Sequence, residues 1–197
     1  MISAIVLAAG LSTRMESKNK LSLSFKGKTV IVTVVENIIN AGIEEVIVVT
    51  GYDADQVQNL LKNLSVKIIY NNDFKKGMTT SIQKGILIAK GDGYMICLAD
   101  MPFITTGEYL QLKSFFENKR QSNEACICVA EHKNKRGNPV IFSSFYQKEI
   151  LTHTNMEGCK EIIQSNKQNV YHVEMDLANI LKDIDTPDEY KQVVSES

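Results

Sequence analysis

The sequence lacks the features that mark several common classes of protein. Its 22 Lys and Arg residues are balanced by 23 Asp and Glu residues, for a net charge of −1, whereas general nucleic-acid binders usually carry a strong basic excess. No segment approaches the ~18 consecutive apolar residues of a membrane-spanning helix, and the first residues contain no basic leader. We therefore expect a cytoplasmic protein that binds neither nucleic acid nor membranes.

The cysteines and histidines form none of the patterns that a metal site or covalent catalysis would require. The four cysteines contain no CxxC pair, and three of them lie in apolar, strand-like runs. The three histidines share no metal-ligand spacing, and no Ser–His–Asp or Cys–His pattern is visible. We predict reduced, mostly buried thiols at Cys97, Cys126, Cys128 and Cys159, and histidines that are structural or exposed.

No repeat, low-complexity tract or linker divides the 197 residues. Hydrophobic residues make up 44% and charged residues 23% of the chain, which are ordinary globular values that argue against disorder and coiled coils. Because the length is close to that of one average domain, we predict a single domain over residues 1–197.

Short apolar runs alternate with amphipathic stretches along the first half of the chain, around a polar segment at 10–28 that we predict to be a loop. The runs predict buried strands at 2–8, 45–50, 66–70 and 94–98. The stretches predict helices at 29–41, 53–64 (capped by Asp53), 79–89 and 107–118. This alternation predicts an α/β fold, in which a Rossmann-like, mostly parallel sheet carries helices on both faces as a three-layer sandwich.

The second half is less regular. Its patterns predict strands at 125–130 and 139–142, helices at 144–151 and 157–164, and extended segments at 169–174 and 180–184. A last helix is predicted to begin at Thr186-Pro187-Asp188-Glu189, where Thr186 suits the N-cap and Glu189 closes a capping box.

The segment LAAGLSTRMESKNK, from Leu7 to Lys20, follows the first predicted strand. Its small residues free backbone N–H groups to cradle a phosphate, and Arg14 and Lys20 are cations that can contact phosphate oxygens. The segment matches neither the Walker A nor the GxGxxG spacing. A polar surface loop with two solvated cations is the alternative that the residues leave open.

Five segments in order along the chain together resemble the MobA-like nucleotidyltransferase family. LAAGLSTRM followed by Asn-Lys resembles that family's LAAGxSxRM signature and its Lys. The other four are GMTTSIQKG (77–85), LADMP (98–102), RGNPVIF (136–142) and DIDTPDEY (183–190). Within the family, the chain most resembles the MocA-like branch, the molybdenum cofactor cytidylyltransferases that are accessory to molybdenum hydroxylases.

The resemblance implies a fold of the nucleotide-diphospho-sugar transferase type, with a nucleotide-binding half at 1–120 and an acceptor-binding half and C-terminal helix at 121–197. The implied reaction is transfer of CMP from CTP to the terminal phosphate of the molybdenum (molybdopterin) cofactor, with Mg²⁺ as the metal and pyrophosphate as the second product. A molybdenum hydroxylase is the implied partner for delivery of the modified cofactor.

The resemblance also implies roles for individual residues. The catalytic residues are expected to be Arg14, Lys20 and Asp100. Nucleotide contacts are expected from Leu7, Ala8, Ala9, Gly10, Leu11, Arg14, Lys20, Thr80, Ser81 and Gly85. Acceptor contacts are expected from Gly137, Asn138, Pro139 and Val140. The Mg²⁺ ligands are expected to be Asp100 and Asp185, with Asp183 the less favoured neighbour.

Ordinary structural roles remain open for the same residues. Asp100 suits a turn, Asp185 a helix cap, Thr80 and Ser81 a helix start, and residues 137–140 a turn before a strand. The choice of CTP depends on Ala9, because the guanylyl branch reads LAGG where this chain reads LAAG, and one added methyl group changes selectivity by only about 1–3 kcal/mol.

Two departures from the family pattern bear on the substrates. Glu16 stands where the family usually has Gly, and Asn155 to Lys160 replaces a GDxGAR segment, with only Gly158 kept and Lys160 in the place of Arg. Lys is a weaker bidentate phosphate ligand than Arg. Three alternatives therefore stay open: a sugar or alcohol phosphate as acceptor, GTP as donor, and a non-catalytic accessory protein that binds nucleotide or cofactor.

Overall fold

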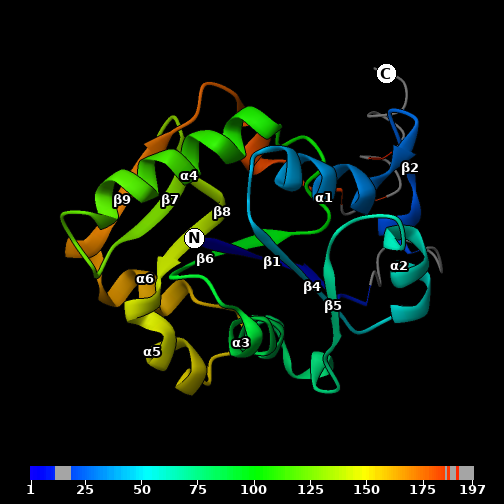
Figure 1. Cartoon of the computed structure of the whole chain (residues 1–197), viewed down its shortest axis with the longest axis horizontal. Helices are drawn as coiled ribbons and strands as arrows, with labels where there is room; N and C mark the ends of the chain where they lie inside the picture. The colour runs from blue at the N-terminus through cyan, green and yellow to red at the C-terminus, as the bar shows by residue number, and fades with distance from the viewer. Residues whose placement is uncertain (12–18, 185, 187–189, 191–197) are drawn as a thin grey trace.

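The computed structural model describes residues 1–11, 19–184, 186 and 190. Its centre is a seven-stranded sheet in the order β5-β4-β1-β6-β8-β7-β9, with helices on both faces (Figure 1). The predicted three-layer α/β architecture is confirmed. The strands of this sheet are β1 (Ile2–Ala8), β4 (Glu45–Thr50), β5 (Lys67–Tyr70), β6 (Gly93–Leu98), β7 (Ile127–His132), β8 (Lys135–Ser143) and β9 (Val170–Glu174).

Two hydrophobic clusters hold the helices on the sheet. Along β1, alternate side chains pack to opposite faces, so that Val6 belongs to one cluster and Ile5 to the other. One face carries α1 (Val30–Asn40), α2 (Ala54–Leu61) and α4 (Thr106–Arg120); the other carries α3 (Met78–Ile88), α5 (Gln147–Thr152) and α6 (Lys160–Ser165). Both faces of the central strands are therefore buried, which explains their continuous apolar sequences.

Most pairs in the sheet are parallel, but β8 is antiparallel to both of its neighbours, β6 and β7. The turn between β7 and β8 places Lys133 and Asn134 at positive φ, as a tight hairpin requires. The predicted strand at 139–142 is only part of β8, which has nine residues. The four strands of the first half lie together on one side of this sheet and the three of the second half on the other, and the two groups meet at the β6–β8 pair.

Three local predictions are corrected. The segment at 10–28, predicted as a loop, contains a short 3₁₀ helix, η1 (Lys20–Ser22), and a hairpin formed by β2 (Ser24–Phe25) and β3 (Lys28–Thr29). The segment at 180–184, predicted as extended, begins inside the 3₁₀ helix η5 (Ala178–Leu181). Asp53 does precede α2, but at φ +51° and with no side-chain capping hydrogen bond.

Other predictions about local structure are confirmed. The four cysteines are buried and free, and burial raises the pKa of the Cys97 and Cys159 thiols. His132 and His172 make structural contacts, His132 Nδ1 to the Met175 carbonyl oxygen at 2.7 Å and His172 Nδ1 to Glu131 Oε2 at 2.7 Å.

Among the helices of residues 1–11 and 19–184, none combines the length and the hydrophobicity that spanning a membrane would need. The last predicted helix lies mostly outside the described residues.

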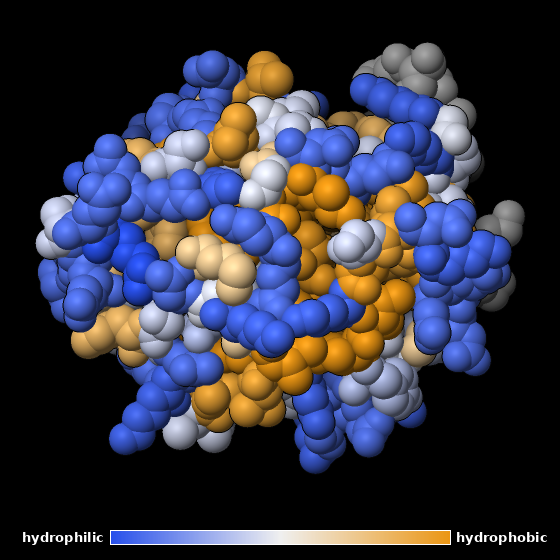
Figure 2. Space-filling model, in the orientation of Figure 1, coloured by the Kyte–Doolittle hydropathy of each residue, from blue (hydrophilic) through white to orange (hydrophobic). Residues whose placement is uncertain are grey.

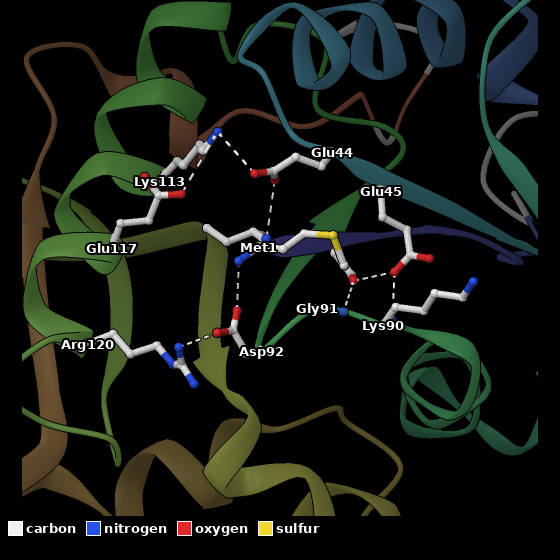
Figure 3. Close-up of polar contacts among 11 residues, drawn as sticks. Met1, Glu44, Glu45, Lys90, Gly91, Asp92, Lys113, Glu117 and Arg120 are labelled. Carbon is white, nitrogen blue, oxygen red and sulfur yellow. Dashed lines mark hydrogen bonds and ion pairs between the residues drawn. The ribbon is translucent and has the colours of Figure 1, made fainter.

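A polar network closes the edge of the sheet where β1, β4 and β6 begin (Figure 3). Glu45, at the start of β4, accepts hydrogen bonds from Ser3 Oγ at 2.5 Å, from the Lys90 amide at 2.8 Å and from the Lys67 ammonium group. Burial alone would raise the pKa of the Glu45 carboxyl, but these three donors outweigh it and lower the pKa. Figure 2 shows an apolar area beside this network, over β1, β4 and β5. This edge is held together by structural contacts, and the opposite edge carries the cavities.

Candidate active site

A cavity of about 530 Å³ lies at the carboxyl ends of β1 and β6. This is the edge at which open α/β sheets bind ligands. The cavity is lined by Leu7, Ala8, Ala9, Gly10, Leu11, Lys20, Leu21, Phe74, Lys75, Gly77, Met78, Ser81, Leu98, Asp100 and Asp183. Eight of the residues that we predicted from the sequence for the nucleotide, the catalytic step or the metal are among them, together with Asp183.

The loop after β1 follows the wall of the cavity from Leu7 to Leu11. Ala9 is only 7% exposed, and its carbonyl oxygen accepts a hydrogen bond from the Tyr52 amide at 3.5 Å. A Cβ atom at Gly51 would meet Phe74 at 2.6 Å and the Ala9 side chain at 2.9 Å. Because Gly51 has no side chain, the residue after β4 can pack closely against both Phe74 and Ala9 of the loop.

Lys20 and Asp100 meet across the cavity. Lys20 Nζ lies 2.5 Å from Asp100 Oδ2, and the two side chains are 14% and 17% exposed. Asn19 positions Lys20, because its side-chain oxygen accepts from the Leu21 amide at 3.0 Å and caps η1. The pair joins residues that the sequence separates by 80 positions, and it places a cation and a carboxylate where both can contact a phosphate group.

The second oxygen of Asp100 has the features of a metal ligand. Oδ1 is buried, and no hydrogen-bond donor in the described part of the chain reaches it. A buried carboxylate oxygen without a donor is costly, and Mg²⁺ prefers such hard oxygen ligands. Asp183 lines the same cavity, so the residues present fit a divalent cation. Among the described residues no group of three His, Cys, Asp or Glu side chains could hold an ion, so phosphate oxygens or water would complete its shell.

The positions of Arg14, Glu16 and Asp185 lie outside the described residues, and their roles remain predictions. We expected Asp185 to be the more favoured metal ligand of the pair Asp183 and Asp185. Asp183 is the one that lines the cavity in the described part of the chain.

Thr80 and Ser81, in the first turns of α3, differ in what they face. Ser81 lines the cavity, whereas Thr80 does not. The Thr80 hydroxyl lies 3.0 Å from the Gly77 carbonyl oxygen and 3.1 Å from that of Asp73. The buried side chain of Asn71 donates to both hydroxyls. The geometry gives Thr80 a structural role, and Ser81 is the hydroxyl that can contact a ligand.

Gly85 also lies away from the cavity lining. A Cβ atom there would meet Ile5 Cγ2 at 2.4 Å, so the missing side chain lets α3 pack closely against β1. The predicted nucleotide contact at Gly85 has no support in this arrangement.

A second cavity of about 370 Å³ adjoins the first, and Met78 and Leu98 line both. Of the predicted acceptor residues, Gly137, Asn138 and Val140 line it and Pro139 does not. A Cβ atom at Gly137 would meet the Ile180 carbonyl oxygen at 2.2 Å, so η5 packs directly against β8 there. The remaining lining residues are Ile82, Ile96, Val129, Arg136, Phe142, Glu157, Cys159, Lys160, Ile163 and Gln164. The result is an apolar slot with a few charged groups.

The loop at 155–158 is fastened to the start of α3, whose Met78 lines both cavities. The Met78 amide donates to the Met156 carbonyl oxygen at 3.0 Å. Thr79 Oγ1 donates to the Asn155 carbonyl oxygen and accepts from the Gly158 amide at 3.0 Å. These bonds fasten the loop that replaces the GDxGAR segment to the start of α3, so Glu157 and Lys160 reach the second cavity.

Phe74, Lys75 and Met78 also line the first cavity, and Asn71 lies behind them; we did not predict these four residues from the sequence. One signal was available, because Asn71 directly follows the strand predicted at 66–70 and precedes GMTTS. Polar residues at that position of an α/β fold often support a site.

The chain is similar in sequence to a known protein family and to several individual proteins. The family described as "MobA-like NTP transferase domain" matches residues 4–170. The molybdenum cofactor cytidylyltransferase of Escherichia coli K12 is 27% identical over 190 residues, which are 96% of this chain and 93% of that protein. The bifunctional protein GlmU of Acetivibrio thermocellus is 28% identical over 93% of this chain, and the match spans only 40% of that protein.

Solved structures share the fold at lower identity. A nucleotidyl transferase from Methanothermobacter superposes with a TM-score of 0.84 at 23% identity, covering 100% of this chain and 97% of the other. A Mycobacterium tuberculosis H37Rv protein solved with manganese gives 0.81 at 21% identity, covering 100% and 99%. CMP:2-keto-3-deoxy-manno-octonic acid synthetase in complex with CTP gives 0.74 at 16% identity, covering 99% and 97%.

Proposed function

Since the chain belongs to the MobA-like NTP transferase domain family, we propose that it transfers CMP from CTP to the terminal phosphate of the molybdenum cofactor. One observation carries this proposal: the Lys20–Asp100 pair lies in a nucleotide-sized cavity that shares a wall with a second cavity. Two substrates bound in these cavities would meet beside that pair. The resemblance of the whole chain to a molybdenum cofactor cytidylyltransferase supports the choice of substrates.

The proposed reaction is an in-line displacement. An oxygen of the acceptor's terminal phosphate attacks the α-phosphorus of CTP and forms a new P–O bond. The bond from that phosphorus to the β-phosphate oxygen breaks, and pyrophosphate leaves with the electron pair. No general base is needed, because the attacking phosphate is already ionised at neutral pH. The protein therefore has to align the substrates and neutralise charge.

The residues of the first cavity suit these tasks. Backbone N–H groups of Ala9, Gly10 and Leu11, with Arg14, would bind the β- and γ-phosphates. The Lys20 ammonium group would stabilise the charge that grows around the α-phosphate. Asp100 with Asp183 or Asp185 would hold a divalent cation. Such a cation, when bound, supplies further neutralisation of the phosphate charges.

The second cavity suits a flat ring that carries an anionic group. Its walls include Ile82, Ile96 and Phe142, and its charged groups include Arg136 and Lys160. Among the described residues, neither of these two cations forms an ion pair. A pterin with a phosphate has this combination of a planar ring and a negative charge.

We extend the proposal to delivery of the product to a molybdenum hydroxylase in the cytoplasm.

The test is release of pyrophosphate by the purified chain with molybdenum cofactor, Mg²⁺ and each of CTP, GTP, ATP and UTP in turn. Release with CTP and the cofactor together, and with neither alone, is the expected result. Release with GTP instead would keep the chemistry and overturn the choice of base. If CTP binds but no pyrophosphate forms, a different phosphorylated acceptor or a non-catalytic carrier replaces the proposal, and sugar and alcohol phosphates are tried next.

A further inference from the structure

A buried amide supports the wall of the first cavity. Asn71 directly follows β5 and is 0% exposed. Its backbone amide donates to the Thr50 carbonyl oxygen at 2.8 Å, which fixes the residue against the end of β4. Neither the predicted site residues nor the reaction proposed above gives this side chain a role.

The hydrogen bonds around Asn71 determine which way its side-chain amide faces. The Asp73 backbone N–H, which can only donate, lies 3.0 Å from Asn71 Oδ1. The oxygen of the amide must therefore face Asp73, and the NH₂ group must face α3. That group donates to Thr80 Oγ1 at 2.9 Å and to Ser81 Oγ at 3.0 Å. Both hydroxyls consequently accept from Asn71.

The hydroxyl protons of Thr80 and Ser81 then differ in the acceptors that they can reach. The Thr80 proton goes to the Gly77 or Asp73 carbonyl oxygen inside the protein. Ser81 is 4% exposed and lines the cavity, and no oxygen in the described part of the chain accepts its proton. Asn71 occupies one of the two lone pairs of Ser81 Oγ, so the other lone pair and the O–H group remain for a ligand. Because no acceptor in the described part of the chain takes up the proton, the O–H group can donate into the cavity.

We propose that Asn71 is a positioning residue that keeps the Ser81 O–H group available as a hydrogen-bond donor toward the nucleobase and thereby favours cytosine. Cytosine presents two acceptors on its pairing edge, O2 and N3, and one donor, the N4 amino group. Guanine presents one acceptor there, O6, and two donors, N1–H and the N2 amino group, so an O–H donor finds more partners on cytosine. The inference rests on the proposed function, because it takes the nucleotide of that reaction to occupy this cavity.

The experiment measures binding of CTP and GTP to the intact chain by calorimetric titration, without acceptor, so that the readout does not depend on turnover. Asn71→Asp keeps the size of the side chain and the acceptor for the Asp73 amide, but it replaces the NH₂ group by an acceptor. The Ser81 proton would then turn toward the new carboxylate. We expect CTP affinity to fall about tenfold, the loss of one hydrogen bond, and GTP affinity to fall less.

A matched control is Asn123→Asp. Asn123 also accepts from a backbone amide, that of Ala125 at 3.0 Å, and donates to a hydroxyl, that of Tyr171 at 3.2 Å. It lines neither cavity. This variant should leave the ratio of CTP to GTP affinity unchanged, so that any shift seen only with Asn71→Asp reflects the position of Asn71.

A double-mutant cycle with Ser81→Ala shows whether Asn71 acts through Ser81. In the Ser81→Ala background, Asn71→Asp should change CTP affinity by less than about twofold. An equal loss in both backgrounds would overturn the positioning role. If the buried carboxylate prevents folding, Asn71→Ala tests the same point without a buried charge, and we expect a loss of about threefold in CTP affinity.

The outcomes separate this inference from the proposed function. A wild-type chain that does not prefer CTP overturns the cytidylyl reading and this inference with it. A wild-type chain that prefers CTP, together with an Asn71→Asp variant that is folded and keeps the same preference, overturns only the role of Asn71.

Discussion

The Ile184 amide donates a 3.0 Å hydrogen bond to the carbonyl oxygen of Asp100. This bond fastens the end of the described chain to the loop that follows β6. Ile184 is completely buried, and its neighbour Asp183 lines the same cavity as Asp100. A carboxylate from the C-terminal segment and one from the centre of the sheet thus reach the same cavity.

Asp100→Asn should strongly reduce turnover without unfolding the protein. The amide removes the negative charge that would hold the cation and pair with Lys20. Transition-state charge stabilisation of several kcal/mol then disappears, so we expect kcat/KM to fall by about a hundredfold or more. Pyrophosphate release measures the loss, and circular dichroism checks the fold. Asp176→Asn, at an exposed carboxylate outside both cavities, is the control, and retained activity in Asp100→Asn would remove Asp100 from the metal site.

Lys160→Met should weaken binding of the acceptor and not of CTP. Lys160 lines only the second cavity, where its charge would neutralise the acceptor's phosphate. We expect the KM for the acceptor to rise about five- to tenfold, with the Kd for CTP unchanged, and Lys160→Arg to restore the KM. Lys148→Met, at an exposed cation of α5 outside the cavities, should have no effect. A rise in both constants would show that the two cavities are not separate subsites.

Glu45→Gln should destabilise the protein in a pH-dependent way. The pKa of the Glu45 carboxyl is lowered in the folded state, so its contribution is present above the pKa of the unfolded chain and disappears as the pH falls through the folded value. We expect a loss of about 1.5–3 kcal/mol in the free energy of unfolding at pH 7 that shrinks below about pH 4. Urea titrations at several pH values measure it.

The ion pair of the exposed Glu117 carboxylate with Lys113, 4.0 Å apart, supplies the control for Glu45. Glu117→Gln should change the free energy of unfolding by less than about 0.5 kcal/mol at any pH. If Glu45→Gln loses as much stability at pH 3 as at pH 7, the carboxylate charge contributes nothing and only packing was disturbed.

Gly85→Ala separates packing from nucleotide contact. The new methyl group would meet Ile5 in the core, and such overpacking costs about 1–3 kcal/mol. We therefore expect a lower Tm and an unchanged Kd for CTP in the folded protein. Gly107→Ala, also in a helix but with its nearest atom 3.8 Å away, should be neutral or slightly stabilising. Loss of CTP binding without loss of stability would restore the predicted nucleotide contact at Gly85.

The parts of the fold that the sequence predicted well are those that local patterns determine. The apolar runs of β1 and β4 are buried on both faces, and their predicted bounds are confirmed at both ends. The hairpin of β2 and β3 was missed because each strand has only two residues, too few to show an alternation. The 3₁₀ helix η5 was mistaken for extended chain because one short turn leaves no helical period.

The site was predictable where residues directly follow a strand. Residues 9–11 and Asp100 come after β1 and β6, and the carboxyl ends of neighbouring parallel strands meet at one edge. The role of Asn71 could not be predicted in this way, because it depends on the orientation of one amide between Asp73 and α3. Likewise, Lys160 reaches the second cavity only because the 155–158 loop is tied to α3 by tertiary hydrogen bonds.

The place of β8 limits how proteins with this architecture can be recombined. β8 comes from the second half of the chain and is hydrogen-bonded to β6 of the first half in the middle of the sheet. A chimaera that exchanged residues 121–197 for those of a relative would have to rebuild this central pair, and a mismatch there would expose two strand edges. New acceptor specificity is therefore more accessible through single substitutions along β8 and the 155–158 loop than through exchange of the whole half.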